Sequence, residues 1–308
     1  METIYDMIII GSGPAGLTAG IYAKRAGLSA LVLEGSFIQG GQIVNTYEVD
    51  NYPGLPGISG MDLADRMKEH LQNQGGKIIR GKVKGISLDD KIKIVHTKKE
   101  DFRTKTVILA AGAVHRKLEV PGEEEFSGMG VSYCATCDGA FFKDKTVAVV
   151  GGGDVAVEDA IFLSRTCKKV YLIHRRDQLR AAKILQDVLK NTPNIETFWS
   201  RRVTEIGGTE QVEWIQTEST AAGQSTRMDV DGIFIAVGIT PDTGFIRNLI
   251  HLDEQGYVIA DENGETNIPG IYAAGDIRTK QLRQIITAAS DGANCVASAE
   301  KYLQNLYL

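Results

Sequence analysis

This chain has few cysteines and prolines and no long apolar run. Its 308 residues include four cysteines and seven prolines, which is too little cysteine for a disulfide-stapled scaffold and too little proline for a collagen-like or low-complexity chain. No apolar stretch approaches the roughly 18 residues that a membrane-spanning helix requires, and the N-terminus lacks the pattern of a secretory signal. We therefore expect a cytoplasmic protein with no membrane partner.

An excess of positive charge is also missing. The chain has 34 basic and 39 acidic residues, a formal net charge of -5, and its basic residues form no extended stripe, so we expect no nucleic-acid partner. Glycine, in contrast, is abundant at 34 residues. We expect these glycines to serve turns and close approaches to ligands. The chain is long enough for two domains, each with its own core.

An internal repeat contains two glycine-rich turns. Residues 6–34 (DMIIIGSGPAGLTAGIYAKRAGLSALVLE) align without a gap with residues 146–174 (TVAVVGGGDVAVEDAIFLSRTCKKVYLIH). Each segment is typical of a buried strand, a turn, a helix and a second strand. Both turns have the spacing G-x-G-x-x-G/A, in which the glycines allow a tight turn, a close pyrophosphate and close packing of helix on strand. The repeat therefore predicts two dinucleotide sites, each at a helix N-terminus.

The residues that end the second strand distinguish the two predicted sites. Glu34 ends it in the first copy, where a carboxylate can accept hydrogen bonds from ribose hydroxyls and would repel a 2′-phosphate. His174 stands at the matching place in the second copy, followed by Arg175, Arg176 and Arg180, and guanidinium groups bind phosphate well. We expect FAD in the first site and NADPH in the second. The alternative for the second cluster is a solvated charged turn.

Two further segments fit a flavin site. Residues 104–113 predict a strand that closes on Gly112, and residues 266–276 predict a strand that ends at Gly275-Asp276, followed by a helix from about Arg283 to Tyr302. A carboxylate at such a strand end can bind flavin ribityl hydroxyls, although each segment alone also fits an ordinary buried strand.

The fold class predicted from these segments is α/β, with two Rossmann-like three-layer dinucleotide-binding domains. The NADPH domain is expected to be inserted into the FAD domain. The predicted bounds are 1–115 and 246–308 for the FAD domain and 116–245 for the NADPH domain.

A Cys-x-x-Cys pair is the candidate redox centre. Cys134 and Cys137 can close a small disulfide ring that carries two electrons reversibly. A zinc site would need about four ligands, and a second pair of suitable spacing is missing, so we expect no metal. The other alternative is a pair of buried thiols. Asp138 is the adjacent candidate general acid, or else a turn residue, and Phe141 with Phe142 forms either a docking patch or part of the core.

Over essentially its whole length the chain resembles the low-molecular-weight thioredoxin reductases of the pyridine nucleotide-disulfide oxidoreductase family. The matching motifs are GSGPAG from Gly11, GGQ from Gly40, CATCD from Cys134, HRRD from His174 and GD at Gly275. The resemblance implies a homodimer with one FAD per subunit, in which electrons pass from NADPH through FAD and the Cys134-Cys137 disulfide to thioredoxin. It further implies that Cys137 faces the flavin and that Cys134 attacks thioredoxin.

The candidate site residues follow from the motifs and the resemblance together. The predicted FAD contacts are Gly11, Ser12, Gly13, Pro14, Ala15, Gly16, Glu34, Gly35, Gly40, Gly41, Gln42, Asn51, Val83, Ala111, Gly112, Gly275, Asp276, Arg283, Gln284 and Ile285. The predicted NADPH contacts are Gly151, Gly152, Gly153, Asp154, Val155, Glu158, His174, Arg175, Arg176 and Arg180. Val155 departs from the family pattern, which has a small hydroxyl residue there, and this removes one phosphate hydrogen bond.

Two other functions remain open at this point. The first is a flavoprotein disulfide reductase for another thioredoxin-fold or peroxidase-coupled partner. The second is a non-catalytic sensor that binds both nucleotides without turnover, for which the relay residues would be unnecessary.

Overall fold

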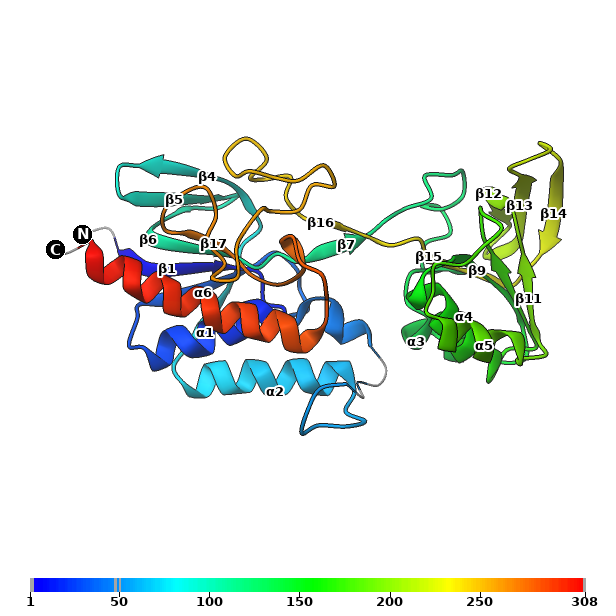
Figure 1. Ribbon diagram of the computed structural model, residues 1–308, viewed down its shortest axis with the longest axis horizontal. Helices are drawn as coiled ribbons and strands as arrows, with labels where there is room; N and C mark the ends of the chain where they lie inside the picture. The colour runs from blue at the N-terminus through cyan, green and yellow to red at the C-terminus, as the bar shows by residue number, and fades with distance from the viewer. Residues whose placement is uncertain (1–2, 47–48, 50, 307–308) are drawn as a thin grey trace. The chain divides into compact units, whose positions relative to one another are not determined.

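A computed structural model of the chain describes residues 3–46, 49 and 51–306; the side chains of Asn45, Thr136 and Cys137 also lie outside the description. The chain forms two compact units (Figure 1). Unit 1 comprises residues 1–114 and 240–308, and unit 2 comprises residues 115–239. Unit 2 is therefore continuous in sequence and interrupts unit 1.

Unit 1 is built on a seven-stranded sheet with the strand order β3-β2-β1-β6-β5-β4. The first half of β6 pairs with β5 and its second half pairs with β17. The strands are β1 (Ile4–Ile10), β2 (Ala30–Glu34), β3 (Lys77–Arg80), β4 (Val83–Asp89), β5 (Ile92–Thr97), β6 (Asp101–Leu109) and β17 (Ile271–Ala273). All pairs except β4-β5 and β5-β6 are parallel. The C-terminal parts of the inner strands β1 and β6 are continuous apolar runs, Met7–Ile10 and Val107–Leu109, because both faces of the sheet are covered there.

Three helices pack on one face of the unit 1 sheet, and the core beneath them contains Met7 and Ile9 from β1. The other face, which carries Ile8 and Ile10, is covered by the segment that contains Ile246 and Val258. The helices are α1 (Pro14–Arg25), α2 (Gly60–Asn73) and α6 (Ile285–Asn305), with short 3-10 turns η1 (Gly41–Asn45) and η3 (Gly275–Ile277).

Helices α1 and α6 approach each other very closely at Gly292, where an added Cβ would lie 2.2 Å from the carbonyl oxygen of Ala15.

Unit 2 repeats the plan of strand, glycine turn and helix. Its parallel sheet has the order β11-β10-β9-β15-β8. Helices cover one face and an antiparallel sheet of order β12-β13-β14 lies over the other. The elements are β8 (Val131–Ser132), α3 (Ala135–Asp138), η2 (Gly139–Phe142), β9 (Thr146–Gly151), α4 (Asp154–Ser164), β10 (Lys169–Ile173), α5 (Lys183–Lys190), β11 (Ile195–Phe198), β12 (Arg201–Gly208), β13 (Val212–Ser219), β14 (Ser225–Asp229) and β15 (Gly232–Ala236). The predicted α/β class and the two Rossmann-like sheets are confirmed.

Two predicted elements differ from the observed ones in their bounds. The strand predicted over residues 266–276 is only Ile271–Ala273, because proline lacks an N–H for the sheet and Gly270, with a φ of +80°, completes a turn after Pro269. The last helix begins at Ile285 rather than at about Arg283. The segments between the units pair with each other as β7 (Ala113–His115) and β16 (Ile239–Pro241).

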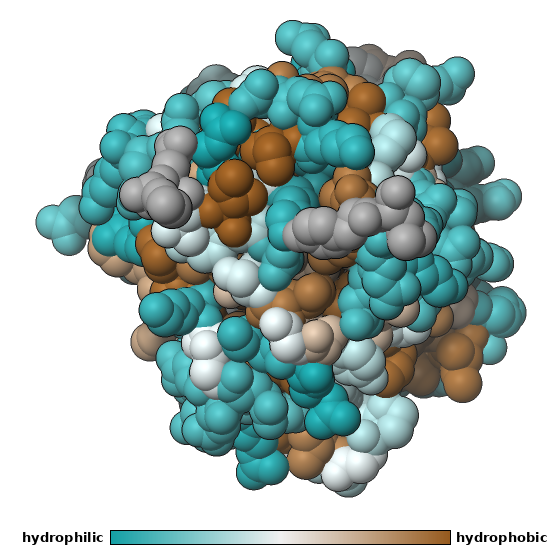
Figure 2. Space-filling model, turned by 90° about the vertical axis from the view of Figure 1, so that its left-hand side faces the viewer, coloured by the Kyte–Doolittle hydropathy of each residue, from teal (hydrophilic) through white to brown (hydrophobic). Residues whose placement is uncertain are grey.

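The surface of unit 1 is largely hydrophilic on the side where β1 begins and α6 ends. Figure 2 shows apolar side chains there in small groups between charged and polar ones. Among the residues that the structure describes, no helix is both long enough and apolar enough to cross a membrane.

A buried lysine, Lys93 on β5, ties the sheet of unit 1 to α6. The residue is only 2% exposed. Its Nζ donates to the carbonyl oxygen of Lys105 at 2.9 Å and to the Tyr302 hydroxyl at 3.1 Å. These acceptors are uncharged. Burial lowers the pKa of Lys93 to about 8, since a low-dielectric site disfavours the ammonium form.

This lysine predicts a pH dependence of stability. Because the folded pKa lies below the unfolded value of 10.5, the unfolded chain binds more protons between pH 8 and pH 10.5, and Lys93 favours folding more as the pH rises through this window. Urea unfolding of the parent and of Lys93→Met should show the parent gaining up to about 3 kcal/mol relative to the variant over that range. If the free energy of unfolding of the two proteins changed with pH in parallel, folding would not lower the pKa of Lys93.

Candidate functional site

The first glycine turn lies between β1 and α1 in unit 1. Gly11 has a φ of +107°, which other residues rarely adopt, and a Cβ on Gly16 would lie 1.9 Å from the Gly11 carbonyl oxygen. Gly13 is the N-cap of α1 and no side chain caps the helix. A Cβ on Gly13 would meet nothing nearer than Gly41 at 3.8 Å. The first N–H groups of α1 are therefore open to a phosphate.

Glu34 is fixed beside this turn by Ser12. One oxygen of its carboxylate, Oε2, accepts the Ser12 N–H at 2.9 Å and the Ser12 hydroxyl at 2.6 Å, while Oε1 accepts the Ser36 N–H at 2.6 Å. A carboxylate has about four acceptor positions, so Glu34 retains capacity for a ribose hydroxyl. Gly35, the next residue, is exposed.

Several of the remaining predicted FAD contacts bind residues that are far away in the sequence. The Gln42 amide donates to the Ala113 carbonyl oxygen at 2.8 Å, and the Asn51 amide donates to Oε1 of Gln284 at 2.9 Å. Val83 is buried at the start of β4, and Ile285 is the first residue of α6. The further predicted contacts in unit 1 are Pro14, Ala15, Gly40, Ala111 and Gly112.

The segment after β17 carries every buried polar side-chain atom that lacks a partner among the described residues: Asp276 Oδ1, Arg278 Nε and Arg283 Nε. Burial raises the pKa of Asp276, although nearby Lys280 and Arg283 oppose this. Buried polar atoms are costly unless they are bonded. A ligand with several hydroxyl groups, such as the ribityl chain of FAD, supplies the donors that Asp276 lacks, so the residues present fit the flavin that the resemblance implies.

The second glycine turn lies between β9 and α4 in unit 2. A Cβ on Gly151 would lie 2.5 Å from the Cβ of Ala156, so this helix also packs closely on its strand. Gly153 is an N-cap with nothing within 4 Å of an added Cβ. Val155, in the first turn of α4, is 61% exposed, and the Asp154 carboxylate accepts a backbone N–H at the start of α5 at 2.7 Å. The turn is as open to a phosphate as the first one.

The ring of His174 packs against the backbone of the second turn. The residue is buried, and a Cβ on Gly152 would lie 2.2 Å from its ring. Its Nε2 lies 3.0 Å from the carbonyl oxygen of Gln178, and burial lowers its pKa. The ring therefore shapes the turn as a packed, neutral group.

The three arginines of this cluster lie at the surface. Arg175, Arg176 and Arg180 are all exposed, as is Glu158 on α4. Within the described part of the chain, their guanidinium groups form no hydrogen bond or ion pair with a protein acceptor. They thus keep their donors for an anionic ligand.

Cys134 lies directly before α3 in unit 2, where it is half-buried and disulfide-bonded. The Ser132 hydroxyl accepts the Cys134 N–H at 3.0 Å and donates to Asp138 Oδ2 at 2.6 Å. Ser132 thereby fixes both the cysteine and the predicted acid. The predicted partner, Cys137, has a side chain outside the described residues, so the Cys134-Cys137 pairing stays a prediction.

The other cysteines and the two phenylalanines have ordinary surroundings. Cys167 and Cys295 are free and buried; burial raises the pKa of both thiols, to about 12 for Cys295. Phe142 is in the core, where its ring packs edge-on against Phe234 at 5.3 Å, whereas Phe141 is 74% exposed. Only Phe141 is therefore available to a docking partner.

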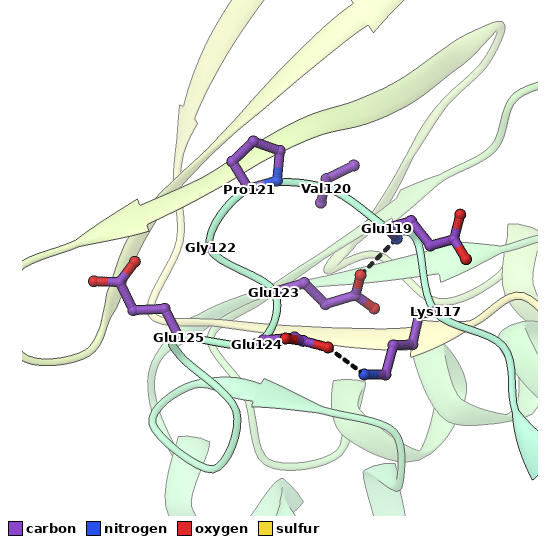
Figure 3. A pocket seen from close by; sticks show the side chains of 8 residues that line it. All are labelled: Lys117, Glu119, Val120, Pro121, Gly122, Glu123, Glu124 and Glu125. Atoms are coloured by element: carbon purple, nitrogen blue, oxygen red, sulfur yellow. Dashed lines mark hydrogen bonds and ion pairs between the residues drawn. The ribbon is translucent and has the colours of Figure 1, made fainter.

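A loop that precedes the cysteines encloses a hollow of about 570 Å³ lined by Lys117 and residues 119–125 (Figure 3). The buried Glu123 accepts the N–H groups of Leu118 and Glu119 at 2.9 and 2.6 Å and the Tyr133 hydroxyl at 2.7 Å. The loop is thus held by its own carboxylate to the residue before Cys134. Its acidic lining does not suit a nucleotide phosphate.

The structure adds two residues that the sequence analysis missed. Ser132 fixes Asp138, and Asp291 on α6 accepts the N–H of Gly275 at 2.9 Å. A signal for Asp291 was present in the sequence, since an acid stands among small residues on a helix that buries one face. Nothing local marks Ser132.

Comparison with known proteins identifies the family. The model of the pyridine nucleotide-disulphide oxidoreductases matches residues 5–292. A thioredoxin reductase of Listeria innocua is 47% identical over 306 residues, covering 99% of this chain and 96% of the relative, and one of Bacillus subtilis is 44% identical over 306 residues with the same coverage.

Solved structures give the same result. The thioredoxin reductase of Lactococcus lactis matches with a TM-score of 0.91 at 44% identity, covering 98% of this chain and 99% of the other. That of T. acidophilum matches with a TM-score of 0.88 at 33% identity, covering 99% and 100%. The chain belongs to the pyridine nucleotide-disulphide oxidoreductase family.

Proposed function

We propose that this chain is an NADPH-dependent thioredoxin reductase, working in the cytoplasm as a homodimer with one FAD per subunit. Electrons pass from NADPH through FAD to the Cys134-Cys137 disulfide and then to the disulfide of oxidised thioredoxin. The relatives support the partner, since those cited above are named thioredoxin reductases. The observation that carries the proposal is the disulfide-bonded Cys134 in the same unit as the unpaired arginines.

The assignment of cofactors to units follows from charge. Unit 1 holds FAD, with the pyrophosphate at the N-terminus of α1, Glu34 on the ribose hydroxyls and Asp276 on the ribityl hydroxyls. Unit 2 holds NADPH, with Arg175 and Arg176 on the 2′-phosphate. When bound, FAD supplies a carrier that accepts two electrons from the nicotinamide and passes two to a disulfide.

The redox step requires protons as well as electrons. Two electrons break the S–S bond and leave two thiolates, and two protons complete the dithiol. When Cys134 attacks thioredoxin, a thiolate leaves the partner disulfide and must be protonated. In this proposal Asp138 supplies that proton as a general acid, and the hydrogen bond of 2.6 Å that it accepts from Ser132, which also binds the Cys134 N–H, supports the assignment.

The direct test is anaerobic NADPH oxidation by the purified yellow protein, with and without oxidised thioredoxin from the same organism. Thioredoxin-dependent oxidation supports the donor, the relay and the partner together. Bleaching of the flavin without any effect of thioredoxin would move the assignment to another disulfide partner. If NADPH did not bleach the flavin, the assignment of NADPH as the electron donor would be wrong.

Replacement of the cysteine should separate the two halves of the relay. Cys134→Ser is expected to keep FAD and to let NADPH bleach the flavin, but to reduce thioredoxin turnover to the background rate, because no disulfide remains to accept electrons. Stopped-flow absorbance of the flavin and steady-state turnover measure the two steps. Cys167→Ala, which removes a free thiol from the same unit, is the matched control and should turn over normally. Turnover by Cys134→Ser would refute the relay.

Replacement of the arginines should remove the preference for NADPH. Each lost charge-assisted hydrogen bond costs roughly 1.5 to 3 kcal/mol, so Arg175→Ala and Arg176→Ala should each raise the KM for NADPH about ten- to hundredfold and leave that for NADH almost unchanged. Arg202→Ala is the control, because Arg202 is exposed in the same unit but already pairs with Glu218 at 2.6 Å. If the ratio of the KM values for NADPH and NADH did not change, the 2′-phosphate would bind elsewhere.

A further inference from the structure

A buried cluster of charges lies beside Asp276 in unit 1. Asp291, on α6, binds Arg278 Nη1 with Oδ1 at 3.1 Å and Lys280 Nζ with Oδ2 at 2.8 Å. The side chains of these three residues are only 11%, 5% and 7% exposed. Oδ2 of Asp291 also accepts the Gly275 N–H at 2.9 Å. One carboxylate thus joins three points of the segment that carries the predicted flavin contacts.

The position of Asp291 is set by the packing of its helix. The next residue, Gly292, lies against the backbone of α1 so closely that an added Cβ would be 2.2 Å from the Ala15 carbonyl oxygen. Because α6 cannot move away from α1 without losing this contact, the distance between the Asp291 carboxylate and Gly275 is fixed by the helix packing.

The two carboxylates of the cluster have different partners. Both carboxylate oxygens of Asp291 have partners, whereas Asp276 Oδ1 is buried and has no partner among the described residues. Lys280 is close enough to Asp276 to lower the pKa of its carboxyl group, against the dominant effect of burial. A buried ammonium without a counter-charge is costly, and Asp276 stands only four residues before Lys280 in the segment that Asp291 holds. Asp276 is therefore a competing partner for Lys280.

We propose that Asp291 is a positioning residue of the flavin site: by binding Lys280 and Arg278, it keeps the Asp276 carboxylate free to accept the ribityl hydroxyls. Asp291 acts through these partners and is not assigned a contact with the flavin. The inference rests on the proposed function only in requiring that the chain binds FAD.

The test is the affinity of the apoprotein for FAD, measured by quenching of flavin fluorescence. Asp291→Asn keeps the shape and an acceptor oxygen for the Gly275 N–H but removes the charge that holds Lys280. We expect its Kd for FAD to rise at least tenfold. The double variant Asp291→Asn/Lys280→Met removes the competing ammonium as well and should return the Kd to within about threefold of the parent, since Arg278 still has the Asp261 carbonyl oxygen at 2.8 Å.

Asp6→Asn is the matched control, because it breaks another partly buried pair of unit 1, with Lys105 at 2.7 Å, and should leave FAD affinity unchanged. An unaltered Kd in Asp291→Asn, or a double variant as weak as the single one, would overturn the proposal, because a loop that had merely collapsed is not rescued by a second substitution. If Asp291→Asn does not fold, the double variant decides alone: a Kd within threefold of the parent supports the proposal and a tenfold loss overturns it. Failure of the parent apoprotein to bind FAD would instead contradict the cofactor assignment, and the inference with it.

Discussion

Close contact between a helix and its neighbouring backbone, which only very small residues permit, is the constraint on which both proposed nucleotide sites depend. In unit 1 a Cβ on Gly16 would lie 1.9 Å from the Gly11 carbonyl oxygen, and in unit 2 a Cβ on Gly151 would lie 2.5 Å from that of Ala156. These contacts bring the first turns of α1 and α4 to the ends of β1 and β9. No side chain caps either helix, so its first N–H groups are open at the strand end, and both turns suit a phosphate.

Charge, rather than backbone shape, makes the two copies of the repeat different. Glu34 is held by Ser12 in an arrangement that leaves it an acceptor for hydroxyls, whereas the matching strand in unit 2 leads to arginines without a protein partner. His174, at the position that corresponds to Glu34, is buried beneath Gly152. It shapes the turn, and in the proposed function the exposed arginines that follow it discriminate between the nucleotides.

The sequence was sufficient for the repeated units because local patterns encode them. Apolar strands and glycine spacing are contained within residues 6–34 and 146–174, and the strand-end charges lie at Glu34 and within the six residues after His174. The strand predicted from residue 266 was too long because an apolar pattern does not show where the Pro269-Gly270 turn interrupts it. Phe141 and Phe142 could not be distinguished in the sequence, since they are adjacent residues of the same type, yet one is exposed and the other is buried. The roles of Ser132 and Asp291 depend on contacts between distant segments, which no local pattern contains.

The proposed relay joins two electron carriers in one enzyme, a flavin in unit 1 and a disulfide at Cys134 in unit 2. Anaerobic titration of the purified protein with dithionite counts the electrons that these carriers accept together. Because a flavin and a disulfide each accept one electron pair, the account predicts an uptake of two pairs per FAD before excess reductant accumulates. An uptake of one pair per FAD would contradict it, since the flavin would then have no disulfide to reduce.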